Sequence, residues 1–243
     1  MKRARSGRMA PSAGIATGLV APLALGAPGN LDPEFADHGR IFLDGEFGQQ
    51  ALAVEALDDG GVLVAGGQPY YDCSYWWYYG YDCEIGDNFA SKLTAQGEPD
   101  ESFSAARPTK VELRDAVRQP DGKIVMAGRR FDTAAPEVHA LAVYRLEASG
   151  ALDTSFGMQG IFEIPSDVHG TCNLASSVVL DSDGRIVVSG ASGEHQIVLR
   201  LLADGTLDAS FGVSGVFTGP LQEFESRSFI ERTAAGYRVS TTG

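Results

Sequence analysis

The sequence predicts an all-β protein: a β-propeller-like array of about four four-stranded antiparallel blades, the last of them incomplete. One motif, in which Gly, Asp and Phe keep the same spacing, recurs four times along the chain. A second motif, Asp-Gly followed by a short apolar run, alternates with it. The 243 residues are 44% apolar and include 30 Gly, whereas apolar stretches with a helical period are hard to find. Many short strands joined by tight turns are therefore expected.

The first motif places Asp three residues and Phe six residues after a Gly. In the last three copies a basic residue, Lys92, Arg145 or Arg200, lies five positions before that Gly. We expect the Asp to cap the turn or to pair with the basic residue, and the Phe to be buried against the neighbouring blade. The segment would then connect one unit to the next. Its repeated residues are Asp32, Phe35, Asp100, Phe103, Asp153, Phe156, Asp208 and Phe211.

The second motif is a hairpin signal, because a two-residue turn that matches strand twist needs the positive φ that Gly tolerates. Its three clear copies contain Gly60, Gly122 and Gly184, and a degenerate fourth copy follows residue 235. The apolar runs after these turns are continuous rather than alternating, as in residues 186–188. Such runs are typical of strands covered on both faces, as the middle strands of stacked blades are.

These motifs predict strands at fixed places in each unit. The last unit lacks a fourth strand, which leaves three alternatives: the outermost strand is missing, the chain is a fragment, or a partner or second copy covers the open edge. The expected strands are residues 40–43, 51–56, 62–65 and 88–93 in the first unit, 111–117, 123–127 and 140–146 in the second, and 161–164, 176–180, 186–189 and 196–202 in the third.

The first 26 residues have the layout of a Sec-type signal peptide, which predicts a secreted protein, periplasmic or extracellular. A basic start is followed by an apolar stretch at residues 13–25 and then by small residues. This stretch is interrupted by Pro22 and is too short to span a bilayer, so we expect no membrane span. The repeat domain then covers residues 29–243.

The chain is acidic, with a net charge of −13. Removing residues 1–26 makes it more acidic, because the charged residues there are all basic. Such a surface repels phosphate backbones, so no nucleic-acid partner is expected.

The two motifs together resemble the delta-60 repeat, a bacterial β-propeller-like family. Its pattern is Asp-Gly-Lys-Ile-hydrophobic-hydrophobic-x-Gly, then Arg-Leu-x-x-x-Gly-x-Leu-Asp-x-x-Phe-Gly-x-x-Gly. The match covers residues 29–243, is best in 121–160 and 183–215, and departs from the pattern at Ala36 and Ser104, where Gly would be expected. The resemblance implies a secreted or surface-associated protein, and it offers no agreed activity and no catalytic residues.

In a four-stranded blade the regular Asp-Gly turns and the connectors lie on one face, and the remaining loops lie on the other. Those remaining loops are irregular here and include residues 129–137, 165–173 and a large insertion at 68–87. Variable loops on a rigid scaffold are where function usually lies.

The insertion is rich in aromatic residues and is bounded by two cysteines. In an oxidising compartment Cys73 and Cys83 are expected to form a disulfide that stiffens the loop, with Cys172 left as a buried residue or an exchange partner. The aromatic side chains suit binding to carbohydrate, peptide or protein. The alternative is that they pack over the blade edge as an extended hairpin. The candidate ligand-binding residues are Tyr70, Tyr71, Tyr75, Trp76, Trp77, Tyr78, Tyr79 and Tyr81.

No catalytic residues, metal site or cofactor are predicted. The four His residues are scattered, and the repeated Asp residues occur once per unit, which favours a structural role. Asp181 and Asp183 lack the further ligands of a calcium loop. The sequence therefore predicts a binding or scaffold protein whose ligand is a glycan or a protein. The alternative is a secreted hydrolase or lyase with a site assembled from several blades.

Overall fold

The computed structural model describes residues 31–41, 50–67, 73–76, 80–83, 88–106, 110–131, 139–165, 173–221 and 227–242. Their regular structure is antiparallel β throughout, which confirms the all-β prediction. None of these segments forms a helix long and apolar enough to cross a membrane. The predicted signal peptide, residues 1–26, lies outside the described residues.

The strands form four sheets and one separate hairpin. Sheet 1 contains β1 (Gln50–Ala56), β2 (Val62–Gly67) and β5 (Asn88–Leu93). Sheet 2 contains β6 (Val111–Arg118), β7 (Ile124–Phe131), β8 (His139–Leu146) and β9 (Ile161–Ile164). Sheet 3 contains β10 (Asn173–Leu180), β11 (Ile186–Ser192), β12 (His195–Leu201) and β13 (Val216–Leu221). Sheet 4 contains β14 (Arg227–Thr233) and β15 (Gly236–Thr242), and the hairpin contains β3 (Cys73–Trp76) and β4 (Gly80–Cys83).

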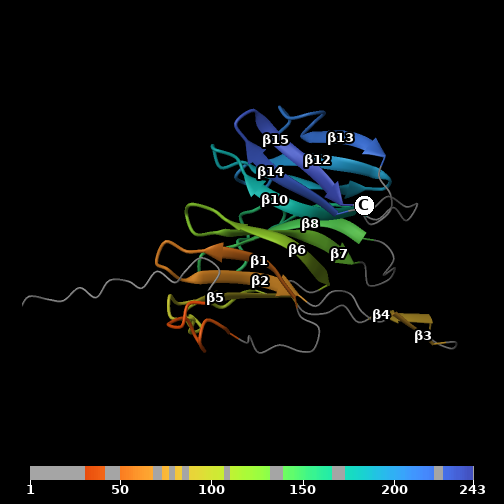
Figure 1. Ribbon diagram of the computed structural model, residues 1–243. Helices are drawn as coiled ribbons and strands as arrows, with labels where there is room; N and C mark the ends of the chain where they lie inside the picture. Colours follow the sequence, from red (N-terminus) through yellow and green to blue (C-terminus); the bar gives the residue numbers. More distant parts are fainter. Residues whose placement is uncertain are drawn as a thin grey trace, which may run out of the picture.

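The four sheets are stacked in a row. The first strand of each sheet lies beside the first strand of the next, so that β1, β6, β10 and β14 follow one another. Figure 1 shows sheet 1 at one end of this row and sheet 4 at the other. The described strands thus form a propeller-like array in which blades two and three have four strands each and the last has two.

The short strand β9 belongs to a different blade from the one that the sequence predicted. Residues 161–164 were expected to begin the third unit, but β9 pairs with β8, with Phe162 opposite Val143, and completes sheet 2. The reason is that the Gly-x-x-Asp-x-x-Phe segment folds back tightly on its own sheet, where the Asp153 amide donates to the Arg145 carbonyl at 2.9 Å. The predicted connector between blades therefore joins the third and fourth strands of one blade.

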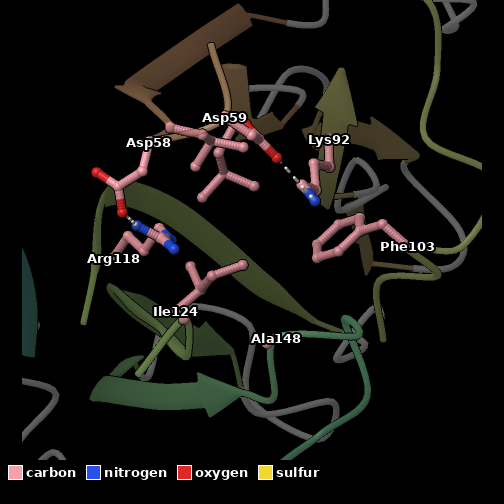
Figure 2. A pocket seen from close by; sticks show the side chains of 10 residues that line it. Asp58, Asp59, Lys92, Phe103, Arg118, Ile124 and Ala148 are labelled. Carbon is pink, nitrogen blue, oxygen red and sulfur yellow. Dashed lines mark hydrogen bonds and ion pairs between the residues drawn. The ribbon is translucent and has the colours of Figure 1, made fainter. Parts of the chain in front are cut away.

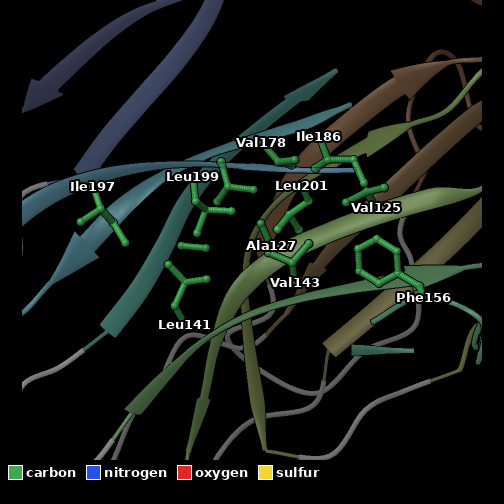
Figure 3. Close-up of a cluster of buried hydrophobic side chains, with 12 residues drawn as sticks. Val125, Ala127, Leu141, Val143, Phe156, Val178, Ile186, Ile197, Leu199 and Leu201 are labelled. Carbon is green, nitrogen blue, oxygen red and sulfur yellow. The ribbon is translucent and has the colours of Figure 1, made fainter. Parts of the chain in front are cut away.

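Successive side chains of the middle strands alternate between two buried faces, which explains why their apolar runs are continuous. In β11, Ile186 and Val188 pack in the core between sheets 2 and 3, whereas Val187 packs in the core towards sheet 4. Successive side chains point to opposite faces of a strand, and both faces of this strand are covered. Figure 3 shows the larger core, where Val125, Ala127, Leu141, Val143 and Phe156 of sheet 2 meet Val178, Ile186, Ile197, Leu199 and Leu201 of sheet 3.

Candidate functional site

The two ends of the sheets differ in how the chain reverses. At the regular end lie the Asp-Gly turns, whose Gly60, Gly122 and Gly184 all have positive φ, together with the segments that join third and fourth strands. At the irregular end lie the connections β2–β5, β7–β8, β9–β10 and β13–β14. Two of the predicted irregular loops were residues 129–137 and 165–173; of these, residues 132–137 and 166–172 fall outside the described residues.

Most of the predicted aromatic site also lies outside the described residues: Tyr70, Tyr71, Trp77, Tyr78 and Tyr79. Tyr75 and Trp76 lie in β3, and Tyr81 lies in β4; the structure describes the backbone of these strands. Figure 1 shows the hairpin apart from the four sheets.

The two cysteines of the insertion lie on the hairpin, where the backbone register pairs Cys73 with Cys83. The disulfide and the ligand-binding role of the aromatic residues stay predictions. Cys172 lies outside the described residues.

A buried ion cluster lies at the irregular end of sheet 2. The Glu112 side chain is 7% exposed, and its Oε2 accepts hydrogen bonds from Arg129 Nε at 2.8 Å and Nη2 at 2.6 Å. Arg114 Nη2 lies 2.5 Å from the other carboxylate oxygen. The Arg129 guanidinium also stacks 5.0 Å from the ring centre of Phe131. Sequence reasoning missed this cluster, although the pairing of β6 with β7 puts Glu112 directly opposite Arg129.

At the regular end, the repeated Asp, Phe and basic residues form one unit per sheet. In sheet 2, Asp153 Oδ2 accepts hydrogen bonds from Arg145 Nε at 2.7 Å and from Lys123 Nζ at 2.7 Å. The Arg145 guanidinium lies 4.7 Å from the centre of the Phe156 ring. Sheet 3 repeats this arrangement with Asp208, Arg200 and Phe211, at 2.8 Å and 4.8 Å. The first copy is simpler, because Asp32 Oδ1 accepts the Glu34 amide at 2.9 Å.

Hydrogen bonds favour the charged form of these carboxylates. Burial alone would raise the pKa of Asp153, but hydrogen bonds from Lys123, Ser155 and Arg145 outweigh it and hold the pKa below its usual range. The Ser210 hydroxyl and Arg200 likewise lower the pKa of Asp208. Hydrogen bonds from Ser102 and Lys92 lower the pKa of Asp100 to about 2. All three are therefore ionised and paired at neutral pH, which suits structural carboxylates better than proton donors.

Each repeated Phe packs against the following sheet. Phe156 is fully buried in the core that includes Ile186 and Leu201 of sheet 3, and Phe211 packs with Ile230 of sheet 4. Phe103 similarly contacts the core of sheet 2, and Phe35 contacts that of sheet 1.

The residue after each of the first three repeated Phe residues hydrogen-bonds to the turn of the next sheet. The amides of Ala36, Ser104 and Gly157 donate to the carbonyls of Gln96, Ser149 and Asp204 at 2.7, 2.9 and 2.7 Å. The motif thus makes the packing and hydrogen-bond contacts that hold neighbouring sheets together.

A cavity of about 260 Å³ lies at the regular end between sheets 1 and 2. Figure 2 shows Asp58, Asp59, Lys92 and Phe103 from sheet 1 and its connector, facing Arg118, Ile124 and Ala148 from sheet 2. Lys92 Nζ lies 3.0 Å from Asp100 Oδ2 and 3.7 Å from Asp59 Oδ2. Arg118 Nη1 lies 3.4 Å from Asp58 Oδ2. The sequence motifs did not predict this cavity.

Among the described residues, no three His, Cys, Asp or Glu side chains come together as a metal site. The Asp181 and Asp183 carboxylates are engaged with side chains. Asp181 accepts a hydrogen bond from the Tyr237 hydroxyl at 2.7 Å, and Asp183 lies 2.5 Å from Arg185 Nη2. These contacts link the turn of sheet 3 to sheet 4 and fix the conformation of the turn.

Comparison with protein-family models supports the fold. Residues 119–156 and 182–211 match a family model described as a domain of unknown function (DUF5122) beta-propeller. A crystal structure of a protein of unknown function from Bacteroides caccae is similar at 14% identity and a TM-score of 0.44, over 80% of this chain and 54% of that protein. This chain thus spans about half the length of that protein, and no curated protein matches it. The residues matched by the family model are thus similar to β-propeller repeats, in agreement with the propeller-like stacking of the four sheets.

Proposed function

We propose that this chain is a secreted or surface-associated binding or scaffold protein, and that it holds a glycan or a protein at the irregular end of its sheets. The observation that carries the proposal is the contrast between the two ends. The repeated Asp, Arg and Phe residues at the regular end are used to join sheets. The variable connections and the aromatic insertion emerge at the irregular end, where a rigid scaffold leaves loops free to recognise a ligand.

The Glu112 cluster supports this assignment, because it stiffens the strand ends beside those loops. Glu112 is held by Arg129 from the neighbouring strand and by Arg114 from its own strand. A carboxylate that is bound by two guanidinium groups fixes the side chains at this end of sheet 2. Binding loops that start from such fixed points lose less conformational entropy when a ligand binds.

Secretion, membership in the delta-60 repeat family and the disulfide belong to the same proposal. The basic and apolar pattern of residues 1–26 supports export, and the two repeat motifs support the family. The pairing of Cys73 with Cys83 across the hairpin supports a cross-strand disulfide, because directly opposed residues are close enough to be bridged. The intact mass of exported protein should show loss of about 26 residues and of the two thiol hydrogens.

The decisive variant shortens the insertion with a turn that this chain already uses. In sheet 3, Gly193 and Glu194 alone connect β11 to β12, and Ser192 pairs with His195. In sheet 1, Gly67 pairs with Asn88 in the same way, so Gly-Glu can replace residues 68–87 without disturbing the strands. We expect the variant to keep the thermal stability of the parent protein.

Both proteins are then applied to a glycan array and to a panel of cell-surface proteins. The proposal predicts binding without turnover by the parent chain and at least a tenfold loss in the shortened variant. Equal binding by the two proteins would place the ligand elsewhere. Release of a product, abolished by a single Asp or His substitution, would replace the proposal with the hydrolase or lyase alternative.

We also propose that a second copy associates with the edge of β15. Among the described strands, β15 pairs with β14 alone, so its other edge presents unpaired amides and carbonyls. Sedimentation velocity over a range of concentrations should show association that Thr241→Lys, which adds a charge to this edge, removes. A wild-type chain that stays monomeric at every concentration would overturn the proposal.

A further inference from the structure

We propose that the cavity between sheets 1 and 2 is a binding site for a guanidinium group, such as the side chain of an arginine. The site lies at the regular end, opposite the loops of the irregular end, and does not depend on them. Its chemistry is shown by the next junction of the same chain, where a guanidinium of the protein itself occupies the corresponding position.

Arg145 is the internal precedent at the junction of sheets 2 and 3. Its guanidinium stacks on Phe156, and its Nη1 donates to the Ala203 carbonyl of sheet 3 at 2.5 Å. Nη1 also lies 3.5 Å from Gln119 Oε1. An aromatic ring on one side and a carbonyl oxygen at the edge are favourable surroundings for a planar cation.

The positions that surround Arg145 all have counterparts at the cavity. When the repeats are superposed on their Asp-Gly and Asp-x-x-Phe motifs, Phe103 corresponds to Phe156, Ala148 to Ala203 and Leu57 to Gln119. All three counterparts line the cavity. The cavity therefore corresponds to the space that a guanidinium fills one junction further along.

One substitution at this junction removes the guanidinium itself. The residue that corresponds to Arg145 and Arg200 is Lys92, which ends in a compact ammonium group without the planar fork. Its Nζ lies 3.0 Å from Asp100 Oδ2, and Figure 2 shows its contact with Asp59. Phe103 is left at the cavity wall.

The charges around the cavity favour a cation. At the next junction Arg145 and Lys123 together pair with Asp153 and Glu147. In sheet 1, Gly61 stands at the position of Lys123 and Thr94 at that of Glu147, so the corresponding group keeps one positive and one negative charge, those of Lys92 and Asp100.

Asp59 of the turn adds a second carboxylate beside Lys92, so Lys92, Asp59 and Asp100 together carry one negative charge in excess. Arg118 and Asp58 at the other side of the cavity balance each other. A bound guanidinium would balance this negative charge. The volume of about 260 Å³ is below the roughly 300–1,000 Å³ of pockets for drug-sized ligands, so it suits one side chain.

The test compares N-acetyl-L-argininamide with N-acetyl-L-citrullinamide, which has nearly the same shape and no charge. Titration calorimetry at low ionic strength should show one saturable site for the arginine derivative and at least tenfold weaker binding of the citrulline derivative. Free L-arginine distinguishes the source of the ligand. Tighter binding of the blocked derivative indicates an arginine residue of a polypeptide, and tighter binding of the free amino acid indicates a metabolite.

The matched variants are Lys92→Arg and Lys110→Arg. Lys92→Arg supplies the guanidinium from within, as sheets 2 and 3 do, and should weaken binding at least tenfold while it leaves the fold intact. Lys110 is exposed and does not line the cavity, so the same substitution there should leave the affinity unchanged. Equal binding of both probes, no saturable binding, or full affinity in Lys92→Arg would overturn the proposal. None of these results would affect the loop-shortening experiment.

Discussion

Replacing Gly205 with Ala measures how closely the turn of sheet 3 approaches sheet 2. Gly205 has a φ of +84°, and a Cβ built there would lie 2.6 Å from the Gly157 amide nitrogen and 2.8 Å from the Phe156 ring. Gly184 is the matched control, because its φ is +83° and a Cβ there meets no atom within 4 Å. The two glycines thus share the backbone conformation and differ in what lies beside them.

The expected magnitudes follow from that difference. A left-handed conformation costs an L-residue about 1–2 kcal/mol, and this is the whole cost expected for Gly184→Ala. Forcing an extra methyl group into a packed site adds about 1–3 kcal/mol. Because the atom that Gly205→Ala would meet is backbone, it cannot rotate away, and we expect a total loss of about 2–5 kcal/mol for this variant.

Urea unfolding followed by far-ultraviolet circular dichroism gives both free energies of unfolding, with the slope m as a check that the unfolded states are comparable. We predict that the loss in free energy of unfolding is larger for Gly205→Ala than for Gly184→Ala by about 1 kcal/mol or more. Equal losses, or a larger loss for Gly184→Ala, would show that the turn at Gly205 does not contact sheet 2.

Four further variants test other contacts within and between the sheets. Phe156→Ala should lower the free energy of unfolding in urea by about 3–5 kcal/mol, because this ring is fully buried. Phe103→Ala should lower it less, because that ring is half-buried beside the cavity. The reverse order would contradict the packing. The pKa of Asp100 lies at about 2, below its usual 3.8, so its pairing stabilises the fold above pH 3.8 and is lost as the pH falls towards 2. Asp100→Asn should therefore flatten the fall in stability over this range, and an unchanged acid profile would exclude the pairing. Burial raises the pKa of Asp115, although it accepts hydrogen bonds from the Val178 amide and the Ser177 hydroxyl, so its ionisation weakens the fold as the pH rises through that pKa. Asp115→Asn should reduce this loss, and a loss that is equally steep in the variant would show that another group is responsible.

The middle strands were predictable because the turn chemistry and the apolar runs agree. Asp-Gly fixes where β6 meets β7 and where β10 meets β11, and continuous apolar runs indicate that β7 and β11 are covered on both faces. The partner of β9 was predicted wrongly. A short strand after the Phe motif fits either blade in the sequence, and only the backbone hydrogen bond from Asp153 to Arg145 shows that the chain folds back on its own sheet.

The sequence likewise predicted the repeated residues of the junctions but not the cavity. The repeated Asp and Phe residues are visible in the sequence because each junction needs them. The cavity was missed because it arises where the repeat is broken, with Lys92 in place of Arg and Gly61 in place of a basic residue. The signal was present in the aligned repeats, but only the packing of Arg145 at the next junction gives these substitutions a physical meaning.

The central claim is that each Phe motif joins its own sheet to the next one along the chain. The most direct measurement is the nuclear Overhauser effect between the Phe156 ring protons and the α protons of Gly205, two groups separated by 49 positions in the sequence. The structure predicts strong cross-peaks, because a Cβ at Gly205 would lie 2.8 Å from a ring carbon of Phe156. Cross-peaks from this ring to the Gly150 turn of its own sheet, and none to Gly205, would contradict the account.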